Sequence, residues 1–141
     1  MISHDPDSGY INVGTYRVQV HDEKTVGLWI IPGKHGNLIA QKYWGKGEDC
    51  PFSIACGVPP SMMLASAVGI PWGMGEYNFL GGLLGAPIPI VKSDATGLSM
   101  PANAELVLEG LRRRRRKSYV RKALLASGRV ITLPAPSIGR W

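Results

Sequence analysis

The chain has 141 residues, enough for one domain with a modest core, and 45% of them are hydrophobic, which argues against a disordered polymer. It lacks a run of about 18 apolar residues that would predict a transmembrane helix, and its N-terminus has acids and a proline where a signal peptide needs basic and apolar residues. We therefore expect a cytoplasmic protein. Charge divides the sequence: residues 1–110 hold six Lys and Arg against ten Asp and Glu, whereas residues 111–141 hold ten Lys and Arg and no acid.

The first half of the chain predicts a hairpin followed by short elements. Alternating apolar and polar residues predict a strand at 16–21, and a second strand at 25–31 follows a polar turn. In chain order we then expect a helix at 37–44, a strand at 51–56, a helix at 62–67 opened by two prolines, a helix at 76–84 and strands at 87–91 and 105–108.

This order mixes hairpins and helices without regular βαβ alternation, so it favours an α+β fold over a doubly wound parallel sheet. The high content of glycine (18) and proline (11) agrees with a turn-rich chain. We place a boundary at Gly110, because the basic segment 111–141 has no clear core pattern. Cys50 and Cys56 are spaced for neither a zinc site nor a CxxC redox motif, and we expect both to be reduced core residues.

Three side chains attract a functional interpretation, each with a plain alternative. His35 lies where a loop meets a helix, a place suited to an anion or metal, although such a histidine is often a surface or capping residue. Arg17 lies in a strand with apolar neighbours, so it either points inward to an acidic partner or occupies a surface position. Glu76 begins a helix, where a carboxylate also complements the helix dipole.

Together these residues belong to a pattern that resembles the cofactor domain of the UbiD-like decarboxylases. The resemblance covers roughly residues 5–110 and keeps the order and spacing of the family's motifs. Its motifs are Asn12-Val13-Gly14-Thr15-Tyr16-Arg17-Val18-Gln19-Val20, Thr25-Val26-Gly27-Leu28, Pro32-Gly33-Lys34-His35, Gly57-Val58-Pro59-Pro60-Ser61, Ala65-Ser66-Ala67, Gly73-Met74-Gly75-Glu76-Tyr77, Gly81, Val91-Lys92 and Met100-Pro101-Ala102-Asn103-Ala104-Glu105-Leu106-Val107-Leu108-Glu109-Gly110.

The resemblance implies a partial split β-barrel that holds prenylated FMN, a cofactor used to remove or add CO₂ on aromatic or α,β-unsaturated acids. In the family a divalent ion, usually Mn²⁺, holds the flavin phosphate, with K⁺ nearby. Asn12, His35 and Glu76 stand at the positions of the metal ligands, and an amide oxygen, an imidazole and a carboxylate suit Mn²⁺. The metal would also offset repulsion between the phosphate and the carboxylate.

The same resemblance assigns further roles to two segments. Arg17 matches the family's catalytic arginine, which contacts the cofactor region, orients the substrate carboxylate and pairs with a glutamate. Ala65, Ser66, Ala67 and Val68 match the segment that lines the flavin. The family's two active-site glutamates, in a motif like E-G-P-F-G-E about ten residues after Gly110, are missing, and so are its flanking domains. We therefore expect a truncated chain with little or no turnover by itself.

A shifted reading frame would explain the basic tail. Codons for residues 121–132, read from each third base, permit Glu-Gly-Pro-Phe (or Ser)-Gly-Glu-Trp-Pro-Gly-Tyr-Tyr, which is the missing motif at about the family's distance. Codon degeneracy also permits other readings. The hypothesis is that a frameshift near Gly110 removed the glutamates and created the arginine run.

Two other functions stay open. The chain could be a non-catalytic module that binds flavin and metal, because its predicted metal and phosphate residues persist without the proton donor. Residues 112–117, five arginines and a lysine, could instead bind nucleic acid, but such a run is more often a solvated tail. Apolar surface left uncovered by the missing domains predicts homo-oligomers or association with those domains.

Overall fold

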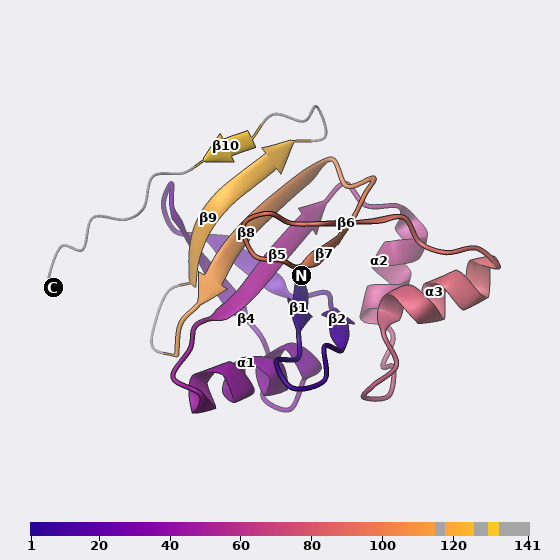
Figure 1. The fold of residues 1–141 in the computed structure, drawn as a ribbon. Helices are drawn as coiled ribbons and strands as arrows, with labels where there is room; N and C mark the ends of the chain where they lie inside the picture. Colours follow the sequence, from indigo (N-terminus) through magenta and orange to yellow (C-terminus); the bar gives the residue numbers. More distant parts are fainter. Residues whose placement is uncertain (115–117, 126–129, 133–141) are drawn as a thin grey trace, which may run out of the picture.

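The computed structural model describes residues 1–114, 118–125 and 130–132, which form one large sheet with helices beside it (Figure 1). The strands pair in the order β2-β1-β5-β8-β9-β4-β3, with β10 on β9, and β6 and β7 form a separate hairpin. The helices are α1 (His35–Gly45), α2 (Pro60–Ala67) and α3 (Glu76–Leu84). The strands are β1 (Ile2–His4), β2 (Ile11–Val13), β3 (Arg17–Val20), β4 (Thr25–Trp29), β5 (Cys50–Cys56), β6 (Ile90–Lys92), β7 (Ser99–Pro101), β8 (Leu106–Arg112), β9 (Ser118–Leu125) and β10 (Val130–Thr132).

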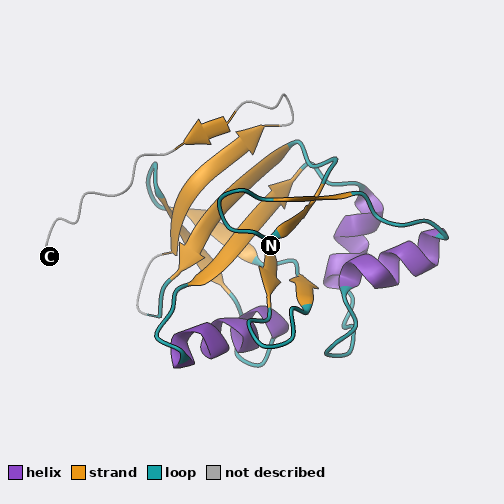
Figure 2. Cartoon of the chain, viewed as in Figure 1, coloured by secondary structure: helices purple, strands orange, loops and turns teal. Residues whose placement is uncertain are grey.

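The prediction of a mixed helix and strand chain is confirmed. Every strand pair found among the described residues is antiparallel, which agrees with an α+β fold and not with a doubly wound parallel sheet. Figure 2 shows α1 along one end of the sheet and the pair α2 and α3 at its side. Within the described ranges the sheet stays open from β2 to β3, so the split barrel remains a prediction.

Several strands were not predicted from the sequence, and the reason is physical. β1, β2 and β7 are three residues long, too short to show a period of two. β8 was expected to end at Leu108, but it pairs with β5 along seven positions and ends at Arg112, beyond the boundary placed at Gly110. β9 and β10 lie in the segment that was expected to have no core pattern, and antiparallel backbone pairing holds them in the sheet.

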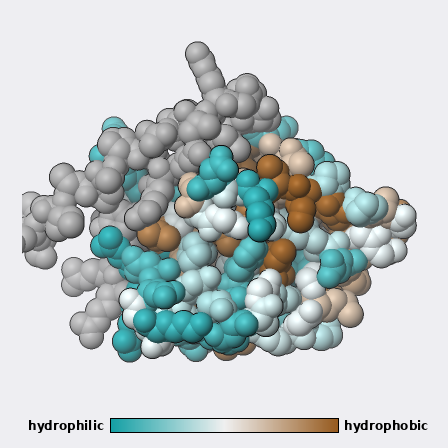
Figure 3. Space-filling model, viewed as in Figure 1, coloured by the Kyte–Doolittle hydropathy of each residue, from teal (hydrophilic) through white to brown (hydrophobic). Residues whose placement is uncertain are grey.

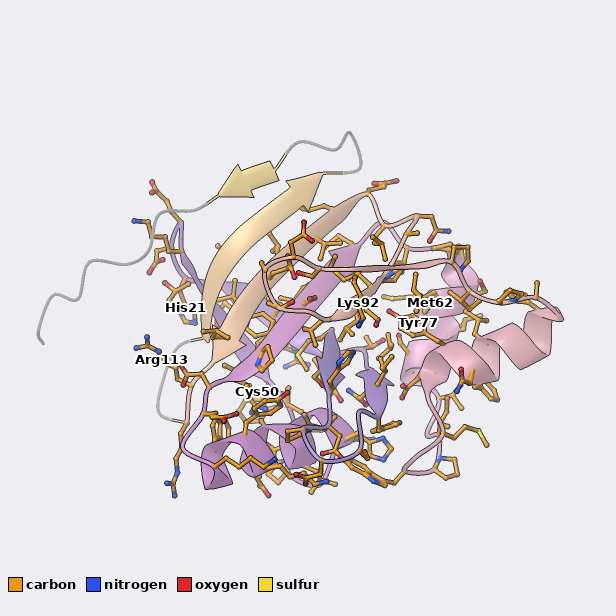
Figure 4. All side chains as sticks on the ribbon, in the orientation of Figure 1. His21, Cys50, Met62, Tyr77, Lys92 and Arg113 are labelled. Atoms are coloured by element: carbon orange, nitrogen blue, oxygen red, sulfur yellow. The ribbon has the colours of Figure 1, made fainter. Side chains whose placement is uncertain are left out.

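The buried apolar side chains form several clusters, some made by strands and loops and some by helices packed against strands. Phe52, with 0% of its surface exposed, packs with Val26 and Ile54 on one side of the sheet. Met62 of α2 and Tyr77 of α3 belong to a second cluster, and Figure 4 shows them beside one another. These contacts attach α2 and α3 to the strands.

The two cysteines differ in their environments. Cys50 is buried, as expected, and burial raises the pKa of its thiol to about 12. Cys56 is exposed, so the expectation that it is a core residue was wrong; it ends β5, where the strand reaches the surface. Both thiols are free.

Arg112 fixes the end of β8 to α1. Its guanidinium donates to the Gly36 carbonyl and to Oδ1 of Asn37, both at 3.2 Å, and lies 5.0 Å from the ring centroid of Trp44. The indole N–H of Trp44 donates back to the Arg112 carbonyl at 3.1 Å. The first arginine of the basic run is therefore part of the packed body.

Replacing Arg112 by alanine is expected to lower the free energy of unfolding by about 1–3 kcal/mol, because two charge-assisted hydrogen bonds and a cation–π contact are lost. Urea denaturation measures the change. Arg114→Ala removes an exposed side chain from the same run and is expected to stay within about 0.5 kcal/mol of the wild type. Equal effects of the two substitutions would contradict the anchoring role of Arg112.

Large apolar side chains remain on the surface. Figure 3 shows hydrophobic residues gathered in the region where β6 and α2 lie in Figure 1. The exposed large hydrophobic residues include Ile90 and Val91 of β6, Met63 and Leu64 of α2, and Leu83 and Leu84 of α3. No helix of the described residues has the length and hydropathy needed to cross a membrane.

Candidate cofactor site

A cavity of about 810 Å³ gathers seven of the eight site residues predicted from the sequence. Its walls come from β2, β3, β4, the start of α1, the end of α2 and the start of α3. The predicted residues that line it are Asn12, Arg17, His35, Ser66, Ala67, Val68 and Glu76. Ala65 is not among its lining residues: it is 3% exposed and packs with Ile2 and Val13, because it lies on the core side of α2.

The three predicted metal ligands enter the cavity from three different elements. Asn12 lies in β2, His35 is the first residue of α1 and Glu76 is the first residue of α3. Asn12 and Glu76 are 2% and 4% exposed, so both polar groups are removed from bulk water. The fold thus brings together residues that are 23 and 41 positions apart in sequence.

Glu76 is held by the backbone of the neighbouring strand. Its Oε2 accepts a hydrogen bond from the Val13 N–H at 2.8 Å. Burial raises the pKa of the Glu76 carboxyl above its ordinary value, while the hydrogen bond from Val13 and the nearby His35 act in the opposite direction. The Glu76 carboxylate lies at the N-terminus of α3, where it complements the helix dipole, and it also faces the cavity.

These residues fit a divalent cation. No Lys or Arg of the described chain forms an ion pair with the buried Glu76. The Met1 ammonium and His35 act on its charge from nearby, and a cation in the cavity would compensate it further. Residues 1–114 hold no cluster of three His, Cys, Asp or Glu side chains, and the predicted set indeed relies on the amide of Asn12 as its third member. Oxygen and imidazole donors of this kind suit Mn²⁺.

Two hydrogen bonds connect the loop after β2 to the end of α2. The Thr15 N–H donates to the Ser66 carbonyl at 3.1 Å, and the two hydroxyl oxygens lie 2.6 Å apart. The Tyr16 hydroxyl accepts from the Gly36 N–H at 3.2 Å and so reaches the start of α1. These contacts tie together the segments that carry Asn12, Arg17, Ser66 and His35.

Arg17 lies on an exposed wall of the cavity. It is the first residue of β3, and its Cα partner in β4 is Trp29, which is 67% exposed and also lines the cavity. The sequence left open whether Arg17 points inward or lies at the surface; it is exposed and faces the cavity at once. Its guanidinium is accessible to an anionic ligand entering from solvent.

Several lining residues were not predicted from the sequence. Trp29 and Tyr16 were interpreted only as members of strands. Their aromatic side chains near Arg17 were the one feature of the sequence that could have predicted their place in the cavity wall. Tyr10 and Trp72, which contact His35, lie in turn and loop segments without periodicity. The unpredicted lining residues are Gly14, Thr15, Tyr16, Trp29, Ile31, Gly33, Lys34, Gly69 and Ile70.

An ion-pair network attaches α1 to the turn after β1. The Lys42 ammonium lies 2.8 Å from Oδ1 and 2.9 Å from Oδ2 of Asp5, whose side chain is 1% exposed, and 3.2 Å from Asp7. Lys46 also pairs with Asp7, at 2.7 Å. The network fixes α1, and therefore His35, relative to β1 and β2.

The pairing of Asp5 predicts a pH dependence. Burial opposes ionisation of Asp5, but hydrogen bonds from Lys42 and Ser8 outweigh it and lower the pKa below its ordinary value of 3.8. A lowered carboxyl pKa stabilises the fold above pH 3.8, and this stabilisation is lost as pH falls through the folded-state pKa. Asp5→Asn is therefore expected to be less stable than wild type at pH 7, with the difference shrinking below pH 3.8. Denaturation at a series of pH values, with exposed Asp94→Asn as control, measures this; a pH-independent difference would contradict it.

A family model described as the 3-octaprenyl-4-hydroxybenzoate carboxy-lyase Rift-related domain matches residues 1–118. The chain belongs to this family, the UbiD family.

Curated relatives and solved structures agree. Ferulic acid decarboxylase 1 of Candida dubliniensis is 36% identical over 107 residues, covering 74% of this chain and 21% of the relative. Pyrrole-2-carboxylic acid decarboxylase of Pseudomonas aeruginosa is 32% identical over 105 residues, covering 74% and 21%. An evolved dimeric form of the UbiD-class enzyme HmfF from Pelotomaculum thermopropionicum, in complex with prFMN, superposes with a TM-score of 0.74 at 34% identity, covering 78% and 26%. The chain thus spans about a fifth of the length of these curated relatives.

Proposed function

We propose that this chain forms the part of a UbiD-type decarboxylase that anchors prenylated FMN, through Mn²⁺ bound by Asn12, His35 and Glu76, with K⁺ nearby. The family reaction is the reversible decarboxylation of an aromatic or α,β-unsaturated carboxylic acid, and the bound cofactor supplies the electron sink for it. The observation that carries the proposal is the single cavity that holds all three ligands, Arg17 and the end of α2. Relatives named as decarboxylases and the HmfF complexes with prFMN and FMN support it.

The lining residues of the cavity would have three roles: metal binding, flavin contact and substrate binding. Asn12, His35 and Glu76 would hold the cation that binds the flavin phosphate, and Ser66, Ala67 and Val68 would contact the flavin from the end of α2. Arg17, exposed at the cavity wall, would bind the substrate carboxylate with two parallel N–H donors and orient it toward the flavin. Ala65 would support this wall from the core. We propose that the sheet of this chain is part of a split β-barrel.

By itself the chain would bind cofactor and turn over little or no substrate. After Glu109 the sequence has no acidic residue, so no glutamate of residues 110–141 can deliver the proton that replaces CO₂. We assign residues 1–110 to the family domain and propose that a shifted frame produced the sequence of residues 111–141, of which Leu111 and Arg112 still pair with β5 as the end of β8. Determining the nucleotide sequence of codons 105–141 tests the tail: a third-base frame without the glutamate motif would show that the tail is native.

The functional test uses the purified 141-residue chain with FMN and Mn²⁺ as probes. We expect FMN to bind, and its fluorescence to be quenched, only when Mn²⁺ is present. After the chain is loaded with prenylated FMN, we expect CO₂ release from ferulate to stay at background. Binding without CO₂ release supports the anchoring module, and CO₂ release would show instead that the chain is a complete enzyme. Failure of FMN to bind with Mn²⁺ would contradict the proposed site.

The exposed apolar side chains of α2, α3 and β6 favour association, either as homo-oligomers or with the remaining domains of a decarboxylase. The relative HmfF has an evolved dimeric form. Sedimentation of the purified chain as a stable monomer would argue against self-association.

A further inference from the structure

Three aromatic side chains contact one another at the start of α1. The Tyr10 hydroxyl lies 3.0 Å from Nδ1 of His35, and the two rings meet edge to face with centroids 5.9 Å apart. The Trp72 ring contacts both: its centroid lies 5.1 Å from that of His35, edge to face, and 5.0 Å from that of Tyr10. We call Tyr10, His35 and Trp72 the ring cluster.

Each member of the ring cluster lies close in sequence to one predicted metal ligand. Tyr10 is two residues before Asn12, and His35 is itself a ligand. Trp72 lies four residues before Glu76, in the loop that leads into α3. Contacts among the three rings therefore fix three separate chain segments relative to one another, and these are the segments that carry the ligands.

The outer side of the cluster is tied to α1 by charge. The Lys42 ammonium lies 5.2 Å from the Trp72 ring centroid and is paired with Asp5 and Asp7. Tyr10 is 8% exposed and Trp72 is 42% exposed, so Trp72 contacts the buried Tyr10 ring while part of its own surface meets solvent. A cation over an indole face is favourable, so Lys42 helps to hold the loop of Trp72 against α1.

The contact with Tyr10 bears on which nitrogen of His35 can bind a cation, because a tyrosine hydroxyl either accepts the Nδ1 proton or donates to a bare Nδ1. A metal-binding imidazole uses one nitrogen, while the other carries its proton and donates it to an oxygen that orients the ring. Because Tyr10 occupies Nδ1, Nε2 is the nitrogen left for the cavity, and it has a free lone pair only when the proton is on Nδ1.

We propose that Tyr10 and Trp72 are positioning residues for the metal site: the Tyr10 oxygen accepts the Nδ1 proton and so selects the tautomer of His35 that can ligate through Nε2, and Trp72 clamps that ring while tying down the loop to Glu76. This assignment rests on the proposed metal site.

The tautomer is measured without any metal. In the metal-free chain, ¹⁵N-detected histidine correlations recorded at alkaline pH are expected to report the Nδ1–H form of His35. Tyr10→Phe keeps the ring and its packing but removes the oxygen, so the Nε2–H form is expected to increase. A wild-type His35 that is mainly Nε2–H, or one whose tautomer ratio ignores Tyr10→Phe, overturns the role of Tyr10.

Metal affinity is the second readout. Electron paramagnetic resonance of free Mn²⁺, titrated with the full chain, with and without FMN, is expected to show about 10–100-fold weaker binding for Tyr10→Phe and for Trp72→Leu. Trp72→Phe, which restores a ring, is expected to recover most of the affinity. Tyr43→Phe is the matched control, because Tyr43 packs in the same core cluster as Tyr10 and is not part of the ring cluster. Thermal melting shows whether each variant folds.

The outcomes separate this assignment from the proposed function. A wild-type chain that binds no Mn²⁺, alone or with FMN, contradicts the proposed site, and the tautomer measurement still decides the role of Tyr10. A wild-type chain that binds Mn²⁺ while Tyr10→Phe and Trp72→Leu bind it as tightly as Tyr43→Phe keeps the proposed site and overturns the assignment of both positioning residues.

Discussion

Replacing Glu76 by glutamine is expected to weaken Mn²⁺-dependent FMN binding by on the order of 100-fold or more, because a charged ligand is lost from the cavity. The same substitution keeps an oxygen that can accept the Val13 N–H, and it removes a buried carboxylate that has no Lys or Arg ion pair in the described chain. The metal-free variant is therefore expected to melt no lower than the wild type.

Isothermal titration with FMN and Mn²⁺, together with thermal melting of the metal-free chain, measures both effects of Glu76→Gln. Glu105→Gln makes the same chemical change at an exposed position and is expected to alter neither binding nor melting. A Glu76→Gln variant that binds like the wild type would remove Glu76 from the site. One that melts much lower would mean that the carboxylate serves the fold instead.

Phe52→Ala is expected to lower the free energy of unfolding by about 3–5 kcal/mol, a large share of the roughly 5–15 kcal/mol that keeps a domain folded. Phe52 has no exposed surface, and it lies in β5, which pairs with both β1 and β8. The cavity left by the ring cannot be filled without moving these strands.

Urea denaturation followed by circular dichroism measures the loss caused by Phe52→Ala. Leu83→Ala also removes a large apolar side chain, but Leu83 is 72% exposed, so its effect is expected to stay within about 0.5 kcal/mol. Similar losses for both variants would mean that β5 is not the centre of the core.

The sequence predicted the helices better than the short strands. α3 was expected at 76–84 and is Glu76–Leu84, because a glycine-rich loop precedes it and Gly85, with φ of 67°, ends it in the left-handed conformation that glycine favours. The pairing of β1 with β5 could not be predicted, since three residues carry no period and their partners are about 50 positions away. Tertiary contacts, not local pattern, select these strands.

The site was predicted as a set of residues but not as an arrangement. Family spacing pointed to Asn12, His35 and Glu76, and the fold places all three on one cavity. Ala65 was assigned to the flavin wall with its neighbours, but one position along α2 rotates a side chain by about 100°, which turns Ala65 into the core. Tyr10 and Trp72 gave no signal, because their function depends on ring contacts between distant segments.

The order in which the chain folds follows from the place of β9 in the sheet. Along the strand order, β9 is the link between the β3–β4 hairpin, which carries Arg17, and the rest of the sheet, and Val26 of β4 pairs with Ser118, 92 residues later. Closing so long a loop is slow, so this wall of the cavity is expected to form last and to open first. In native-state hydrogen exchange, amides of β3 and β4 should exchange before those shared by β5 and β8; equal protection would show that the sheet assembles and opens as one unit.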